Sequence, residues 1–388
     1  MAEHQPGPGR LRELAVLFFK LGTIAFGGPA AHVAMFEDEV VKRRGWISHE
    51  HFLDLLGLTN LIPGPNSTEM AIHIGKVRAG WRGLIVAGLC FLTPAIVLTV
   101  LLAHLYVTYG TLPQFAPVVA GMRPAIIAII LGAVYRLGKP LARKSTASVI
   151  IGLLVALLSL ARINEILLLF GGGFVAVLWA NRKRLGKSPL VFLAVALLVP
   201  IVPATTNAVA QSDGITLTAL GLFFLKIGSI LYGSGYVLVA FLQGGLVESR
   251  HWLTQTQLLD AIAIGQFTPG PVLSTAAFIG YVLLGFPGAA VATIGIFLPS
   301  FVFVLILSPS VSKIRTVPSL GAFLNGVNGA ALGLMLAVCG TLGVPTLTSA
   351  LPWLIFLAAV ILIWRWNLHP AWLVVGSAVV SWFATTCL

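Results

Sequence analysis

Charged side chains are the first thing that this sequence lacks. Only 9% of its 388 residues are charged, whereas 58% are hydrophobic and the mean hydropathy is +0.98. A soluble globular protein carries charges on roughly a quarter of its residues, because its surface must be solvated. The scarcity of charge excludes an ordinary soluble protein and predicts a chain that is embedded in a membrane.

Acidic residues are scarcer than basic ones: 12 Asp and Glu stand against 24 Lys and Arg, which gives a formal charge of +12. In a membrane protein such an excess first reflects orientation, since Lys and Arg are retained on the cytoplasmic side. We therefore take the lipid bilayer, and not a nucleic acid, as the partner that this charge implies.

Cysteine is nearly absent, and its three copies lie singly in apolar runs at Cys90, Cys339 and Cys387. No Cys-x-x-Cys or Cys/His spacing is present, so neither a disulfide framework nor a metal site is predicted. The sequence also lacks a nucleophile elbow, a phosphate-cradling loop, a zinc-protease motif and a flavin fingerprint. We therefore predict no enzyme activity and no cofactor. The apolar stretch after the polar first ten residues has no small-residue cleavage site, which predicts no removable signal peptide.

Apolar stretches fill most of the chain, and we compare them with the about 20 residues that a helix needs to cross a bilayer. The predicted fold is an all-α polytopic membrane protein with about thirteen spans. These spans are residues 11–28, 49–79, 82–107, 114–137, 145–161, 163–180, 189–205, 216–233, 254–285, 287–308, 320–343, 347–364 and 369–387. The stretches 49–79 and 254–285 are too long and too broken to be ordinary helices.

The two halves of the chain repeat each other at an offset of 206 residues, which slips to 205 after the first third of the repeat. The repeat includes Lys20, Gly22, Gly27, Trp46, Asp54, Pro63, Gly64, Pro65, Gly75, Gly80 and Pro94, which return as Lys226, Gly228, Gly233, Trp252, Asp260, Pro269, Gly270, Pro271, Gly280, Gly285 and Pro299. Such a repeat defines the architecture before any single residue is interpreted. We predict a six-span unit in residues 1–182, a basic loop and linking span in 183–212, and a second six-span unit in 213–388.

The number of spans between the two units predicts their relative orientation. Six spans and one linking span place the second unit upside down, so that the N-terminus is cytoplasmic and the C-terminus is outside. The basic loop at 181–187 supports this orientation. Residues 42–44 are then an exception, predicted to face outward. In the alternative, residues 49–79 form a re-entrant hairpin that returns to its own side.

Pro-Gly-Pro interrupts the apolar stretches at 63–65 and 269–271. Proline removes a backbone donor and clashes with the preceding turn, so each helix must break there. Broken backbone at membrane depth lines a wet cavity or is buried in protein, and the half-helix that follows presents an N-terminus that attracts anions. We predict substrate contacts from Pro63, Gly64, Pro65, Asn66, Ser67 and Thr68 and from Pro269, Gly270 and Pro271. The alternative is a kink with a local polar patch, but a matched pair of breaks favours a transport site.

Lys20 and Lys226 lie near the middle of spans that are otherwise apolar, at equivalent positions of the repeat. A lysine at that depth is costly unless it is paired or faces water, although its long stem can snorkel to the interface. Two lysines beside glycine-rich turns (Gly27 and Gly28, Gly233 and Gly235) predict a cationic site that suits an anion. Arg123 is a third positive candidate, with the capping of a kink before Pro124 as the alternative.

Acidic residues and histidines supply candidates for proton coupling. Asp54 and Asp260 form a symmetric pair, which either faces the lysines or starts helices near the interface. Glu69 precedes His73 by four residues, on the same helical face. His32 is a further candidate, although residues 32–44 read as an amphipathic stretch with a solvated face.

Several long motifs resemble the chromate ion transporter family. In the first half these are Phe26 to His32, Gly45 to Ser48, Leu61 to Glu69 and Ala79 to Gly83; in the second half they are Gly265 to Pro271, Phe278 to Tyr281 and Gly295 to Ser300. Gln266, which precedes the second break within such a motif, is counted with the substrate-binding candidates. The resemblance implies a long-chain, two-domain member that exports chromate across the bacterial cytoplasmic (inner) membrane and confers chromate resistance, with sulfate as a similar competitor. One departure is Tyr232-Gly233-Ser234-Gly235, where the family has a Phe followed by glycines.

Other functions stay open at this point. One is the import or exchange of sulfate or another oxyanion, and a second is a passive anion channel. The residues alone predict an anion as the ligand, and they leave the coupling ion and the formation of a homodimer undetermined.

Overall fold

The computed structural model describes residues 8–26, 28–110, 112, 115–185, 214–232, 235–307, 318–366 and 368–387. Gly27, Gly233 and the predicted linking span at 189–205 lie outside these residues. All regular structure within them is helical, which confirms the all-α prediction. Four helices, α4, α5, α12 and α14, are long and apolar enough to cross a membrane by their length and composition.

The helices of the first half are α1 (Pro8–Ile24), α2 (Gly28–Glu37) with a π-helix (Asp38–Arg43), α3 (His49–Thr59), α4 (Asn66–Tyr109), α5 (Ala116–Lys144), α6 (Thr146–Leu160) and α7 (Glu165–Leu185). Those of the second half are α9 (Leu217–Ile230), α10 (Leu238–Leu242) with a π-helix (Gln243–Glu248), α11 (Gln255–Phe267), α12 (Thr275–Leu307), α14 (Pro318–Thr346), α15 (Ala350–Trp366) and α16 (Pro370–Cys387).

The long helices α4 and α12 are each folded back on themselves. The backbone leaves helical geometry at Ala79 and Gly80 in α4 and at Leu284 and Gly285 in α12. A Cβ added at Gly75 would overlap the carbonyl oxygen of Gly83 across the fold, and the same holds for the equivalent pair in α12, Gly280 and Gly288. Glycine is required at these positions because the two limbs touch backbone to backbone.

Residues 49–79 do not form one continuous rod, because the chain reverses direction between α3 and the first limb of α4. His51, near the start of α3, lies close enough to act electrostatically on His73, near the end of the first limb of α4. A continuous span would separate these residues by about 30 Å. In the second half, a Cβ at Gly265 of α11 would touch Thr275 of α12 across the second break. The chain thus reverses direction within residues 49–79, which is the path that the re-entrant alternative expects.

A second returning helix was not expected from the sequence. The chain turns back after α1, and the rings of Phe18 and Phe36 meet at 5.6 Å between α1 and α2. His32 in α2 is completely buried. The prediction of a solvated face for this stretch is thus wrong at His32, although Lys42 and Arg43 at its end are exposed.

The basic residues at the end of this returning helix lie at the same end of the molecule as those near Arg78. The guanidinium groups of Arg44 and Arg78 both lie over the ring of Trp46, at 5.1 and 4.8 Å, and Arg78 also pairs with Glu13 near the start of α1. The prediction that residues 42–44 face the side opposite to Arg78 is therefore wrong. Because α2 turns the chain back after α1, residues 42–44 lie at the same end as the other basic residues of the first half and are no longer an exception to their distribution.

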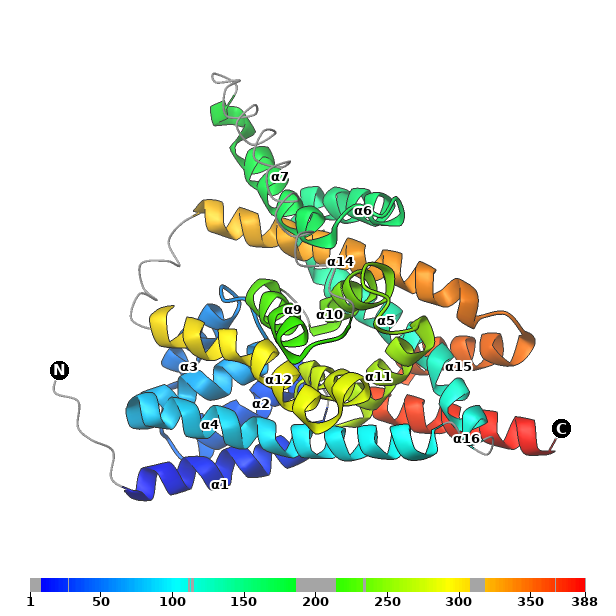
Figure 1. The fold of residues 1–388 in the computed structure, drawn as a ribbon. Helices are drawn as coiled ribbons and strands as arrows, with labels where there is room; N and C mark the ends of the chain where they lie inside the picture. The colour runs from blue at the N-terminus through cyan, green and yellow to red at the C-terminus, as the bar shows by residue number, and fades with distance from the viewer. Residues whose placement is uncertain are drawn as a thin grey trace.

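The two halves pack against each other reciprocally. Helix α5 packs on α15 and α16 of the second half, while its counterpart α14 packs on α6 and α7 of the first half. Within each half the first helix lies along the long limb that follows the fold, α1 along α4 and α9 along α12 (Figure 1). An exchange of the same contacts in both directions is the pattern that a two-fold relationship between the halves produces.

Candidate functional site

The two Pro-Gly-Pro breaks are held by the same hydrogen bond in opposite directions. The Gly64 amide donates to the carbonyl oxygen of Leu231 at 2.7 Å, and the Gly270 amide donates to the carbonyl oxygen of Ala25 at 2.7 Å. Each carbonyl directly follows the end of the first helix of the other half, α9 or α1. The φ angles of Gly64 and Gly270 are 143° and 93°, values that favour glycine. Each break is therefore pinned to the other half, and its central amide is already engaged.

The surroundings of Gly64 join a buried acid to the second half. A Cβ at Gly64 would overlap Oε1 of Glu69 and Oγ of Ser300, and the Ser300 hydroxyl donates to Glu69 Oε1 at 3.4 Å. Both side chains are fully buried. At the other break the counterpart of Ser300 is Ala95, whose Cβ lies 2.9 Å from a Cβ built on Gly270. The polar centre is thus present at one break only.

The first turn of α4 supplies further polar groups beside this centre. Ser67 and Thr68 are buried, and Thr68 Oγ1 has no hydrogen-bond partner among the described residues. The amide group of Asn66 donates to Asn60 Oδ1 at 2.9 Å. Backbone amides of a first helical turn have no acceptor within the helix, so this end of α4 presents donors and a partial positive charge.

The second break carries a matching but different set. Tyr236 donates its hydroxyl to Gln266 Oε1 at 3.1 Å, and Gln266 Nε2 is buried without an acceptor within the part of the chain that the structure describes. Thr268 and Ser274 lie across the break with their hydroxyl oxygens 3.4 Å apart. Buried polar atoms without partners are rare in folded proteins and mark places for water, ions or ligands.

Three predicted proton-coupling residues are buried beside the breaks. Glu69 Oε2 and both ring nitrogens of His73 lack hydrogen-bond partners in the described chain, and both residues are fully buried. His32 Nε2 lies 2.9 Å from the Ala25 carbonyl oxygen, which also accepts from Gly270. Glu69 and His73 lie one helical turn apart in α4, and the exposed His51 of α3 is near enough to His73 to act on it electrostatically.

The two lysines do not enter this polar centre directly. Lys20 and Lys226 lie on exposed faces of α1 and α9. Lys226 interacts electrostatically with Glu165 and Arg250. Gly28 starts α2 with a φ of 77°, and Gly235 starts a 3-10 helix. The counterpart turn residues Gly27 and Gly233 lie outside the described chain.

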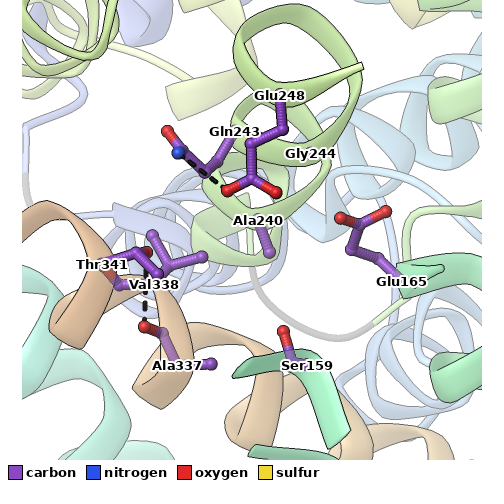
Figure 2. Close-up of a pocket in the computed structure, with 9 residues that line it drawn as sticks. All are labelled: Ser159, Glu165, Ala240, Gln243, Gly244, Glu248, Ala337, Val338 and Thr341. Carbon is purple, nitrogen blue, oxygen red and sulfur yellow. Dashed lines mark hydrogen bonds between the residues drawn. The ribbon is translucent and has the colours of Figure 1, made fainter. Parts of the chain in front are cut away.

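Glu165 also borders a small cavity between α6, α7, α10 and α14. This cavity of about 20 Å³ has room for one water molecule. The carboxylates of Glu165 and Glu248 project toward it, above the hydroxyl of Ser159 (Figure 2). Within the described residues no group of three His, Cys, Asp or Glu gathers to hold a metal ion.

Arg123 and Asp260, two separate candidates in the sequence, form one ion pair. Arg123 Nε donates to Asp260 Oδ1 at 2.8 Å, so Arg123 pairs an acid of the second half and does not cap a kink. Asp260 accordingly pairs with this arginine, and not with a lysine. Asp54, its counterpart in α3, is half-buried.

A family model described as "Chromate transporter" matches residues 12–177 and 218–382. The chain belongs to the chromate transporter family. The two matched segments begin 206 residues apart, which is the offset of the internal repeat.

Relatives within the family cover nearly the whole chain. A "Chromate transport protein" of Cupriavidus metallidurans is 33% identical over 88% of this chain and 86% of its own length. A "Probable chromate transport protein" of Synechococcus elongatus is 33% identical over 92% and 90%. A "Chromate transport protein" of Pseudomonas aeruginosa is 30% identical over 98% and 94%. No solved structure shows a significant match to the chain.

Several residues of this transporter's site escaped the sequence analysis. Ser300, Tyr106 and Glu165 were not singled out, yet they contact or approach Glu69, Asp260 and Lys226. Ser300 could have been found from the repeat, because it directly follows the repeated Pro299 and corresponds to Ala95 in the first half. The other two are joined to their partners only by tertiary packing.

Proposed function

We propose that this chain is a secondary transporter that exports chromate across the bacterial inner membrane and thereby confers resistance to chromate. The names of two relatives that share about a third of its residues, a chromate transport protein and a probable one, support chromate as the substrate. The observation that best supports a transport mechanism is the pair of reciprocal hydrogen bonds at the two breaks. Through these bonds each break, where we place the substrate, is held by the other half of the chain. Such a pair of discontinuous helices is typical of a transporter binding site.

The groups at the breaks suit a tetrahedral dianion. Such a ligand needs several hydrogen-bond donors and positive charge around it. The first-turn amides of α4, the Thr68 hydroxyl and the free amide nitrogen of Gln266 supply the donors. Lys20 and Lys226 supply positive charge along the approach to the breaks, from the exposed faces of α1 and α9, and Arg123 supplies a third positive charge on α5. The remaining predicted contacts come from the glycines, prolines and polar residues of the breaks and of the adjoining turns.

Both the path of the chain and the distribution of its basic residues support an inverted arrangement of the halves. In the first half every helix that enters is followed by one that returns, so a single linking span at 189–205 would turn the second half over. At the end that holds Trp46, the first half has six basic residues, and five of their counterparts in the second half are not basic. The basic set is Lys42, Arg43, Arg44, Lys76, Arg78 and Arg82, and the counterparts are Glu248, Ser249, Arg250, Tyr281, Leu283 and Pro287. The positive-inside rule then places these two ends on opposite sides of the membrane. The N-terminus is cytoplasmic and the C-terminus is outside.

The membrane potential is sufficient as a driving force for a dianion. Moving two negative charges outward across an inside-negative potential gains about 4.6 kcal/mol per 100 mV. Glu69 and His73, with Asp54, Asp260 and His32 as further candidates, provide the route for a coupled proton. The two halves rock about the breaks and open them to either side in turn.

Flux measurements test this proposal. Everted membrane vesicles energised by respiration should accumulate isotopically labelled chromate, and sulfate should compete. Uptake that requires sulfate on the opposite side would favour the second candidate, a sulfate or oxyanion exchanger. Flux in proteoliposomes that does not saturate and is not stimulated by counter-substrate would identify a passive anion channel. Chromate reduced by the purified protein would contradict a purely transporting function.

A further inference from the structure

Three donors converge on one carboxylate where α4, α5 and α11 meet. Arg123 binds Asp260 with two parallel hydrogen bonds, from Nε to Oδ1 at 2.8 Å and from Nη2 to Oδ2 at 3.1 Å. The Tyr106 hydroxyl adds a third, to Oδ2 at 2.9 Å. The Asp260 side chain is 2% exposed, whereas that of Arg123 is 25% exposed.

This set of donors is one that binds oxyanions in general. A planar guanidinium matches two oxygens of a carboxylate, and it matches two oxygens of a tetrahedral oxyanion equally well. A buried ion pair is a poor way to hold two helices together, because both charges lose their hydration. A well-packed apolar pair stabilises a static contact at least as well. Charged residues in membrane segments are therefore a mark of function.

The two halves differ at this point, both in the paired residues and in the helix contact that these residues join. Asp54 takes the place of Asp260 in the first half, but the counterpart of Arg123 is Asn328. The packing of α5 on α15 and α16 recurs as that of α14 on α6 and α7, whereas the contact of α5 with α11 has no counterpart of similar extent between α14 and α3 among the described residues. The arginine is thus not required by the packing that the two halves share.

The carboxylate is attached to an element of the transport site. Asp260 lies in α11, which leads into the second Pro-Gly-Pro break, whereas Arg123 and Tyr106 lie in α5 and α4 of the other half. A relative motion of the halves that opens the break would withdraw Asp260 from the donors and leave the partly exposed arginine open.

We propose that Arg123 and Tyr106 form a second binding station for the transported oxyanion, which Asp260 occupies as a tethered competitor in this conformation. This inference rests on the proposed function and adds a station away from the Gly64 break. As the halves move, the oxyanion replaces the carboxylate on the arginine. When the oxyanion leaves, the carboxylate returns, so the arginine is never left buried without an anion.

Binding of labelled chromate to the purified full-length protein in detergent tests the station. Replacing the competing carboxylate in Asp260→Asn should tighten binding by about tenfold, which is the usual scale of one charge-assisted hydrogen bond. The double variant Asp260→Asn with Arg123→Gln should lose that gain. Glu39→Gln removes the acid of another arginine pair, with Arg43 and Arg44, and should leave the affinity unchanged. A normally folded Asp260→Asn protein with unchanged or weaker binding overturns the proposal.

Two further variants separate the station from a static ion pair, even if Asp260→Asn fails to fold. The exchange of charges in Arg123→Asp with Asp260→Arg preserves an ion pair but moves the arginine to α11; a static role predicts restored transport, and the station predicts none. Tyr106→Phe keeps the ion pair and removes one donor, so the station predicts a severalfold higher KM for chromate efflux and a static role predicts no change. If wild-type protein neither binds nor transports chromate, the proposed function fails. If the wild-type protein transports chromate and the variant with exchanged charges does so too, this inference fails while the proposed function stands.

Discussion

The Gly64 amide donates to the Leu231 carbonyl oxygen of the opposite half at 2.7 Å, and it does so from a position where a Cβ would overlap Glu69 and Ser300. The φ angle of 143° and the contacts with Glu69 and Ser300 leave no room for a side chain. The centre of the first break is therefore a position where one methyl group disturbs both halves at once.

Alanine at Gly64 should impair both stability and transport. The unfavourable backbone region alone costs about 1–3 kcal/mol, and the overlap with Ser300 and Glu69 adds to it. We expect a thermal unfolding midpoint that is several degrees lower and chromate flux at least about tenfold lower. Gly57→Ala in α3 is the matched control, because a Cβ there meets nothing within 4 Å. Equal behaviour of the two variants would contradict the assigned role of Gly64.

Removal of the lysine charge should weaken transport without unfolding the protein. Lys20→Ala and Lys226→Ala are expected to lower chromate flux in everted vesicles by about tenfold each, since a charge-assisted contact with the anion is lost. Lys144→Ala, at the exposed end of α5, should leave flux unchanged. Normal flux in both lysine variants, at normal abundance, would remove the lysines from the site.

Glu69 should decide whether transport responds to a pH gradient. Because Glu69 is fully buried beside the break and His73 connects it toward exposed His51, its replacement by Gln removes the proton carrier but keeps the shape. Glu69→Gln is expected to retain flux driven by an imposed potential and to lose the effect of an imposed pH gradient. Glu13→Gln, whose acid pairs with Arg78 at the surface, should respond as wild type does. An unchanged pH response in Glu69→Gln would argue against proton transfer at this residue.

Single cysteines at equivalent ends of the two halves test the inverted arrangement. In a background without Cys90, Cys339 and Cys387, the variants Lys42→Cys and Ser249→Cys place exposed thiols at the corresponding ends of the two halves. A membrane-impermeant thiol reagent added to intact cells should label position 249 and spare position 42, and everted vesicles should give the reverse. Labelling of both from one side would defeat the inversion.

The class of protein, the repeat and the positions of the breaks could all be predicted from the amino-acid sequence. Membrane embedding follows from the scarcity of charge over the whole chain, a property that no particular contact can alter. The breaks follow from the local chemistry of Pro and Gly, and the structure has helices ending at Thr59 and Phe267 shortly before them. The motifs around these breaks also carried the family resemblance, which the family model confirms.

The turns of the chain and the pairing of its polar groups depend on how the helices pack in the folded protein. A broken span and a re-entrant hairpin have the same local sequence, and the choice depends on whether the limbs find a packing surface, here the contact of α3 with α4. The partners of Gly64 and Arg123 are Leu231 and Asp260, which lie in the other half of the chain. Such pairs are brought together by the packing of the two halves, because hydrogen bonds and ion pairs act over a few ångströms and no local pattern in the sequence encodes their separation.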